Sequence, residues 1–285
     1  MKNYKYKITA VIILYNVTDV IFECLKNLKN IKIIIADNGD NNPDTIKEIK
    51  KNKNIVKYFR FKKNIGFGRA CNFCLRYVET DFTLLINPDA LIKENDLKIL
   101  ENSFENYPNA GIVVPTLVDI YGKNKDKLEN LPELNALNSN HKYNGSFEGD
   151  TCVNFCWAAI WLLNNRIIKD LGLFNKEQFI YWEDFYLCRK LKKKGIPIIK
   201  IYESKAIHNA STSTKKTIKS NFIIYKHHIL SSYIYFNVQK KSFYLKKKFF
   251  IYFFRSISYL LILNLNNSLK NFARLCAVIS YINKK

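Results

Sequence analysis

The sequence has few acidic residues for its length. Its 285 residues include 24 Asp and Glu against 46 Lys and Arg, which gives a formal net charge of +22. A chain this basic is expected to favour phosphates, anionic lipid head groups or nucleic acid as partners. The alternative is that its richness in Lys, Asn and Ile reflects only the nucleotide composition of the coding DNA.

A second CxxC pair is missing. Cys71 and Cys74 form one pair, and no other pair or His partner follows at finger-like spacing, so a zinc site is not expected. The cysteines are odd in number and most lie in apolar runs. This pattern indicates reduced, packed thiols in a reducing compartment. They occupy positions 24, 71, 74, 152, 156, 188 and 276.

The chain also lacks a long apolar run. The segment from Phe249 to Leu265 carries Arg255 and is somewhat short for a membrane span. The run from Ile8 to Leu14 is too short for a signal peptide and no cleavage site follows it, so we expect a buried strand there. Internal repeats and low-complexity tracts are absent. Hydrophobic residues make up 48% of the chain, which provides for a sizeable core and argues against global disorder.

Short apolar runs alternate with segments of helical spacing along most of the chain. This alternation predicts an α/β fold, with a mostly parallel sheet and helices on both of its faces. Strands are expected at residues 8–14, 32–36, 56–61, 82–86, 111–115, 152–163 and 196–201. Helices are expected at residues 19–28, 43–51, 69–78, 95–106, 165–171 and 183–194. Residues 119–150 are polar and aperiodic, which predicts a long loop or lid.

The composition changes beyond about Thr217. Residues 221–238 and 242–282 are aromatic, basic and of helical spacing. We therefore expect an α/β domain over residues 1–215 and a helical extension over residues 216–285. The favoured interpretation of the extension is an amphipathic segment in the membrane interface, held by Lys246 to Lys248 and nearby Phe and Tyr. A pair of core-packing helices or an oligomer interface is the alternative.

The expected strands end in polar residues. Ligands of open α/β sheets bind beyond the carboxyl ends of the strands, and a packed core would not need polar endings there. The sequence therefore predicts a binding site at that edge, formed by Asn16, Asp37, Asn38, Asn64, Asn87 and Asp89.

Glu183 and Asp184 open the helix that is expected to end at Gly195. A carboxylate held there against the cavity can take a proton from an incoming hydroxyl. Repulsion between the two neighbouring acids tends to raise one pKa toward a useful range. The alternative is that these acids only complement the helix dipole.

Six motifs occur in order and at plausible spacing. They are Val11-Ile-Ile-Leu-Tyr-Asn16, Ile35-Ala-Asp-Asn-Gly39, Asn64-Ile-Gly-Phe-Gly-Arg-Ala-Cys-Asn72, Leu84-Leu-Ile-Asn-Pro-Asp89, Trp182-Glu-Asp184 and His208. Together they resemble the family 2 glycosyltransferases over residues 8–210, and most of all the rhamnosyltransferase-type enzymes of bacterial polysaccharide assembly. The resemblance implies a GT-A fold, a nucleotide-diphosphate sugar donor, Mg²⁺ or Mn²⁺, and inversion at the anomeric carbon.

The resemblance implies that the donor binds at the strand ends and at the glycine-containing segment after the third strand. Backbone N–H groups at that junction can approach a diphosphate, although a tight turn is the alternative. Gly68 stands where the family more often has alanine. For Asp37 the alternative is a turn carboxylate before Asn38-Gly39. The implied donor-binding residues are Tyr15, Asn16, Asp37, Asn38, Asn64, Gly66, Arg69, Asn72 and Asn87.

The implied metal ligands are Asp89 and His208. Asn87-Pro88-Asp89 occupies the place of the family's Asp-x-Asp motif, where hard oxygen ligands hold the cation. Because Asn87 offers only a neutral carbonyl, lower metal affinity is expected. A Pro turn, and for His208 a phosphate contact or a structural role, are the alternatives.

The resemblance makes Asp184 the catalytic base, with Glu183 beside it contacting or orienting the acceptor sugar. Trp157 and Trp182 could stack on sugar faces as acceptor-binding residues, and could equally be core aromatics.

The sequence thus predicts an inverting hexosyltransferase acting on a lipid-linked or growing surface glycan, at the cytoplasmic, inner face of the cell membrane. Rhamnose on a deoxythymidine diphosphate carrier is the family-level expectation, and glucose, galactose and galactofuranose remain open. A non-catalytic basic protein that binds membrane or nucleic acid would not need the ordered acids, and no nucleic-acid partner is expected. A nucleotidyltransferase would want a basic Gly-rich loop after the first strand, which Tyr15-Asn16-Val17-Thr18 is not. The oligomeric state stays open.

Overall fold

The chain forms two compact units. The computed structural model describes residues 7–39, 41–124, 128–129, 131–132, 142–143, 148–208 and 217–284. The sheet unit comprises Met1–Phe174 and Asp184–Lys215. The helical unit comprises Asn175–Glu183 and Lys216–Lys285. Each has a hydrophobic core of its own.

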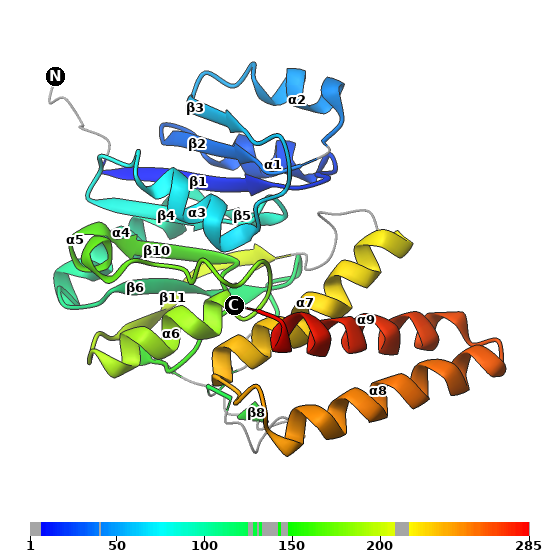
Figure 1. Cartoon of the computed structure of the whole chain (residues 1–285). Helices are drawn as coiled ribbons and strands as arrows, with labels where there is room; N and C mark the ends of the chain where they lie inside the picture. Colours follow the sequence, from blue (N-terminus) through cyan, green and yellow to red (C-terminus); the bar gives the residue numbers. More distant parts are fainter. Residues whose placement is uncertain are drawn as a thin grey trace, which may run out of the picture. The chain divides into compact units, whose positions relative to one another are not determined.

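Nine of the described strands form one sheet, in the order β3-β2-β1-β4-β10-β6-β11-β5, with β9 paired to β11 (Figure 1). Most of these strands are short apolar runs, as expected of strands covered on both faces. They are β1 (Ile8–Leu14), β2 (Lys32–Asp37), β3 (Ile55–Arg60), β4 (Phe82–Ile86), β5 (Ala90–Ile92), β6 (Ile112–Val118), β9 (Thr151–Cys152), β10 (Ile160–Asn164) and β11 (Ile198–His208).

The sheet is mixed. Strands β3, β2, β1 and β4 are parallel to one another, as expected. Strand β10 lies between β4 and β6 and is antiparallel to both, so β6 runs in the same direction as β4. Strand β11 is parallel to β6, whereas β5 pairs antiparallel with β11.

Helices pack on both faces of the sheet (Figure 1). Because successive side chains of a strand point to opposite faces, Ile12 joins the core formed with α1, α2 and α4, whereas Val11 joins the core formed with α3, α5 and α6. The helices are α1 (Val20–Asn27), α2 (Pro43–Ile49), α3 (Phe67–Leu75), α4 (Glu94–Asn106), α5 (Asn165–Ile168) and α6 (Glu183–Lys193), and a 3₁₀ turn, η2 (Lys169–Leu171), follows α5.

Two expected strands differ most from those in the structure. The apolar run 152–163 is not one strand, because Phe155 and Cys156 are buried in the core outside the sheet, between the end of β9 and the start of β10. The late strand β11 is longer than expected and includes His208 itself. Much of the expected loop or lid at 119–150 lies outside the described residues. Within it, β7 (Leu128–Glu129) pairs with β8 (Lys142–Tyr143).

The helical unit contains α7 (Ile218–Phe236), α8 (Phe243–Leu261) and α9 (Leu265–Ile282). The expected helical region 242–282 is broken at the turn between α8 and α9, where Leu263 has a φ of 56°. The core of the helical unit contains aromatic side chains such as Tyr233, Tyr252 and Tyr281. Among the described residues, no helix combines the length and the apolarity needed to cross a membrane.

We expect Leu162→Ala to lower the free energy of unfolding by about 2–5 kcal/mol, because it removes a fully buried side chain from β10 and leaves a cavity. Val56→Ala is the control, since Val56 is exposed on β3, and its effect should stay within about 0.5 kcal/mol. Denaturant unfolding measures both. Equal effects of the two changes would contradict the position of β10 at the centre of the core.

Candidate functional site

The polar strand ends meet at one edge of the sheet. Parallel strands β1 to β4 end there, and β6 and β11 run the same way. Strand β10 runs in the opposite direction, so its first residues lie at this edge too. The Asn87 amide donates a hydrogen bond to the carbonyl of Ala159, 2.9 Å away, just before β10 begins. The edge therefore gathers residues from distant parts of the chain.

Two asparagine amides join the ends of β2 and β3. Asn38 Nδ2 donates to Asn64 Oδ1 at 2.9 Å, and Asn38 Oδ1 accepts from the Ile65 amide at 2.9 Å. Asn64 Oδ1 also accepts from the Gly66 amide at 2.8 Å. Gly66 caps α3 with a φ of 91°, a conformation that favours glycine. The predicted donor-binding residues Asn38, Asn64 and Gly66 thus form one connected group.

Tyr15 and Asn16 follow β1 at the same edge. The Tyr15 ring covers Gly39, where an added Cβ would lie 2.5 Å from Tyr15 Cδ2. Glycine at 39 is therefore required for this ring packing. Asn16 has a φ of 47°, and within the described residues its buried Oδ1 has no hydrogen-bond partner. A buried acceptor in this state is suited to a donor group from a ligand.

Asp37 is completely buried. Its carboxylate accepts from the Tyr58 hydroxyl at 2.7 Å and from the Asn41 amide, and Arg60 Nε lies 3.6 Å from Oδ2. Burial, and then the hydrogen bond to Asp37, raise the pKa of Tyr58 well above its usual range, so Tyr58 stays a donor. Asn41 also accepts from the Val17 amide at 2.7 Å. These bonds favour an organising role for Asp37, and its contact with a nucleotide stays a prediction.

Asp89 and His208 lie side by side although 118 residues separate them in the chain. Asp89 Oδ1 is 3.4 Å from His208 Nε2. The antiparallel pairing of β5 with β11 places His208 opposite Ala90, which follows Asp89. Burial, and then the charge of Asp89, raise the pKa of the Cys24 thiol to about 12. This thiol also lies 3.8 Å from the carbonyl oxygen of Asn87, so the Asn-Pro-Asp turn packs on α1.

The Asp89–His208 pair fits a divalent cation. A carboxylate and an imidazole are both common metal ligands, and they converge here from two strands. In the described part of the chain no group of three His, Cys, Asp or Glu side chains could hold a metal. A two-residue site is still compatible with Mg²⁺ or Mn²⁺, because Mg²⁺ is often bound by one or two carboxylates together with substrate phosphates and water.

Asp184 lies in the first turn of α6 and is 8% exposed. Its Oδ1 accepts from the Phe185 amide at 2.8 Å. The Phe185 ring stacks on Phe155 at 4.0 Å and lies 5.6 Å from the ring of Trp157. Since Trp157 stands two residues before Ala159, this aromatic group connects Asp184 to the edge at Asn87. Trp157 is 48% exposed, so its ring is accessible for stacking.

Sequence reasoning missed Lys200. It is a buried cation in β11 within the apolar stretch Ile198–Ile201, and a lysine at such a position is the signal that could have found it. Burial raises the pKa of the Cys156 thiol, while the charge of Lys200 lowers it and that of Asp184 raises it. Lys200 and Asp184 therefore act on the same thiol.

Trp182 and Glu183 belong to the helical unit. The Trp182 ring is buried and packs against Tyr235 at 5.3 Å and Phe236 at 5.4 Å. This packing favours the core role that the sequence left open for Trp182. Glu183 is half-buried and is the first residue of α6.

Arg69 and Asn72 lie on α3, the helix that Gly66 caps. Arg69 is exposed. Asn72 Nδ2 donates to the Phe174 carbonyl at 2.8 Å, and Asn72 Oδ1 accepts from the Phe174 amide at 3.0 Å. This pair of bonds joins α3 to Phe174, where the first part of the sheet unit ends. Donor binding by these two residues stays a prediction.

The fold and the strand-end site define a GT-A glycosyltransferase. The sequence profile of glycosyl transferase family 2 matches residues 9–172, which is more than half of the chain. The protein belongs to this family, and the resemblance inferred from the six motifs is confirmed.

Two similar proteins are rhamnosyltransferases. Rhamnosyltransferase WbbL of Escherichia coli is 23% identical over 245 residues, which cover 79% of this chain and 90% of that protein. An N-acetylglucosaminyl-diphospho-decaprenol L-rhamnosyltransferase of Mycobacterium tuberculosis is 20% identical over 231 residues, covering 72% of this chain and 74% of that protein.

Solved structures share the fold. TarS 1-349 from S. aureus gives a TM-score of 0.56 at 15% identity and covers 97% of this chain and 89% of its own. The mannosyltransferase PcManGT from Pyrobaculum calidifontis, in complex with GDP-Man and Mn²⁺, gives a TM-score of 0.55 at 14% identity. The match covers 98% of this chain and 74% of that chain. At these identities the likeness concerns the fold alone.

We expect Asp89→Ala to weaken nucleoside diphosphate binding at least about tenfold when Mn²⁺ is present, equivalent to about 1.4 kcal/mol. With excess EDTA the variant and the wild type should bind alike, because the lost carboxylate acts through the cation. Thermal shift and calorimetric titration measure this. Asp44→Ala, at an exposed position of α2, is the control. Unchanged Mn²⁺-dependent binding by Asp89→Ala would contradict the metal role.

Proposed function

We propose that the protein transfers a hexose, with inversion, from a nucleoside diphosphate to a lipid-linked glycan acceptor at a membrane surface. The observation that carries this proposal is the meeting of Asp89, His208 and the strand-end asparagines at one edge, to which the aromatic group beside Asp184 is joined. Family membership supports the class of reaction.

The relatives suggest the two substrates. One is named a rhamnosyltransferase, and the other transfers L-rhamnose to N-acetylglucosaminyl-diphospho-decaprenol. We therefore propose a deoxythymidine diphosphate rhamnose donor and a polyprenyl diphosphate acceptor that carries a sugar. The rings of Trp157 and Phe155 offer an apolar face for the acceptor sugar.

In this reaction the acceptor hydroxyl oxygen attacks the anomeric carbon from the face opposite the diphosphate. The new C–O bond forms as the bond from the anomeric carbon to the diphosphate oxygen breaks, and the hydroxyl proton goes to the Asp184 carboxylate. Asn38, Asn64 and the amide of Gly66 orient the nucleotide at the strand ends.

Asp89 and His208 would hold the cation, with Asn87 beside them. When bound there, a divalent cation stabilises the negative charge of the leaving diphosphate. The neutral Asn87 gives the site fewer anionic ligands than two carboxylates would, so we propose a weakly held Mg²⁺ or Mn²⁺ that binds together with the donor.

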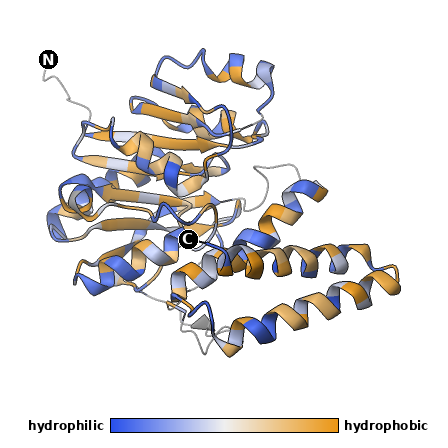
Figure 2. Cartoon of the chain, in the orientation of Figure 1, coloured by the Kyte–Doolittle hydropathy of each residue, from blue (hydrophilic) through white to orange (hydrophobic). Residues whose placement is uncertain are grey.

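We propose that the helical unit binds the membrane through the turn between α8 and α9. Residues 217–285 contain no Asp or Glu and carry 12 Lys and Arg, so the three C-terminal helices are complementary to an anionic lipid surface. Figure 2 shows apolar residues along both helices up to the turn. The exposed apolar side chains near the turn include Phe254, Ile257, Leu260, Leu261, Ile262, Leu263 and Leu265.

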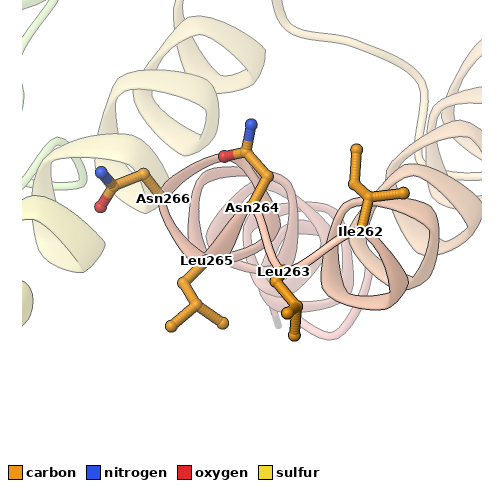
Figure 3. A pocket seen from close by; sticks show the side chains of 5 residues that line it. All are labelled: Ile262, Leu263, Asn264, Leu265 and Asn266. Atoms are coloured by element: carbon orange, nitrogen blue, oxygen red, sulfur yellow. The ribbon is translucent and has the colours of Figure 1, made fainter.

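The turn itself presents these side chains openly. Ile262 to Asn266 line a shallow hollow, and in Figure 3 the side chains of Leu263 and Leu265 point away from the helices. Leu263 is 82% and Leu261 is 78% exposed. An apolar tip on a basic helical segment is typical of segments that insert into the head-group region. This support is specific to a lipid surface, since a nucleic acid would not require an apolar tip.

We expect Asp184→Asn to lower kcat by about 100-fold or more, because the amide cannot take the acceptor proton. Nucleotide binding should stay within twofold of the wild type. Glu183→Gln is the comparison, and its main effect should be a higher KM for the acceptor. Transfer of a labelled sugar to a synthetic lipid-linked acceptor measures these constants. Wild-type turnover by Asp184→Asn would remove this residue from the mechanism.

We expect Leu261→Asp combined with Leu263→Asp to abolish sedimentation of the protein with phosphatidylglycerol vesicles, because two carboxylates would enter the apolar interface. The control is Ile218→Asp, which changes an equally exposed apolar residue at the start of α7. The wild type should bind phosphatidylcholine vesicles weakly, and high salt should reduce binding to the anionic ones. Equal binding by the turn variant and the control would contradict this surface.

A further inference from the structure

The segment Asn175–Glu183 precedes Asp184 in the chain but packs with the C-terminal helices. Residues on both sides of it, up to Phe174 and from Asp184 onward, belong to the sheet unit. The chain therefore leaves the sheet unit, is held within the helical unit, and re-enters the sheet unit at the carboxylate that acts as the base.

Side-chain hydrogen bonds from two residues hold the backbone carbonyls of this segment. Ser231 Oγ, on α7, donates to the Ile180 carbonyl at 2.9 Å. Gln178 Nε2 lies 3.4 Å from both the Trp182 and the Ser231 carbonyl oxygens. Gln178 is 1% exposed and Ser231 is also buried, so these bonds are shielded from water.

Aromatic contacts hold the same segment along α7. The ring centroids of Phe179 and His227 are 4.6 Å apart, and those of Tyr181 and His228 are 5.7 Å apart. Trp182 packs against Tyr235, about two turns further along the helix. The segment therefore contacts α7 through both its carbonyls and its rings.

The backbone at Tyr181 and Trp182 is strained. Their φ angles are 67° and 69°, so two consecutive large residues adopt the left-handed conformation. Bulky side chains rarely occupy this region, and such strain persists only where the surrounding contacts determine the conformation. The two strained residues come immediately before Glu183 and Asp184, which begin α6.

We propose that Ser231 and Gln178 are positioning residues for the base. By holding the Ile180 and Trp182 carbonyls, they keep Tyr181 and Trp182 in the left-handed conformation and thereby set the direction in which Asp184 enters α6. This proposal rests on the role of Asp184 in the proposed function. It gives α7 a part in catalysis without contact with either substrate.

Ser232 provides a matched control. It neighbours Ser231 on α7, is similarly buried, and its Oγ donates within the helix to the Ile229 carbonyl at 2.7 Å. Ser231→Ala and Ser232→Ala thus each remove one serine hydroxyl from the same helix. Only the first removes a bond to the segment before Asp184.

The test compares kcat, donor KM and hydrogen exchange in these two variants of the full chain, well below their melting temperatures. We expect Ser231→Ala to lower kcat at least tenfold with donor KM within twofold, and to speed amide exchange in residues 175–184. Ser231→Thr, which keeps the hydroxyl, should recover most of the rate. Ser232→Ala should match the wild type in kcat and in exchange at 175–184.

Wild-type kcat in Ser231→Ala, or an equal loss in Ser232→Ala, would overturn the proposal. Unchanged exchange at 175–184 in Ser231→Ala would do so as well, whatever the sugar donor. If the wild type transfers a sugar other than rhamnose, the donor assignment fails, and the same kcat comparison is made with that sugar. The two failures are therefore distinguishable.

Discussion

The antiparallel position of β10 between β4 and β6 determines where the reactive side chains lie. Because β10 runs against both neighbours, its first residues meet the last residues of β4, and the Asn87 amide bonds to the Ala159 carbonyl there. The same reversal makes β6 and β11 run with β4, so that His208 finishes at the edge where Asp89 begins the return into β5. Without this strand the carboxylate, the imidazole and Trp157 would have no reason to share an edge.

Much of the sheet could be predicted because its strands are short apolar runs that end in polar residues. The bounds of β1 and β4 agree with the sequence, and the GT-A fold follows from the order of motifs. The direction of β10 could not be predicted, since an apolar run such as Ile160–Asn164 carries no sign of which neighbour it will pair with. Tyr58 beside Asp37 and the burial of Lys200 also depend on pairings that bring distant residues together. The division between Trp157, which is exposed, and Trp182, which is packed, was open in the sequence for the same reason.

The helical unit combines a packed aromatic interior with an exposed apolar turn. Its interior is a cluster of tyrosines, where burial raises the pKa of Tyr233 well above its usual range. Its outer side at the α8–α9 turn is apolar, and Arg255 and Lys270 are the nearest cations in sequence. The packed interior includes α7, the proposed support for the segment before Asp184, and the exposed turn is the proposed contact with lipid. A family fold that binds nucleotide sugars thus carries an extension whose composition suits a bilayer.

The packing of Asn175–Glu183 on α7 has a consequence for biosynthesis. During translation the strands that surround Asp89 emerge before α7, the helix that holds the chain ahead of Asp184. The proposed base would therefore reach its setting only after α7 has been synthesised. A chain cut short before α7 would have the strand-end edge but would lack the bonds that are proposed to direct Asp184.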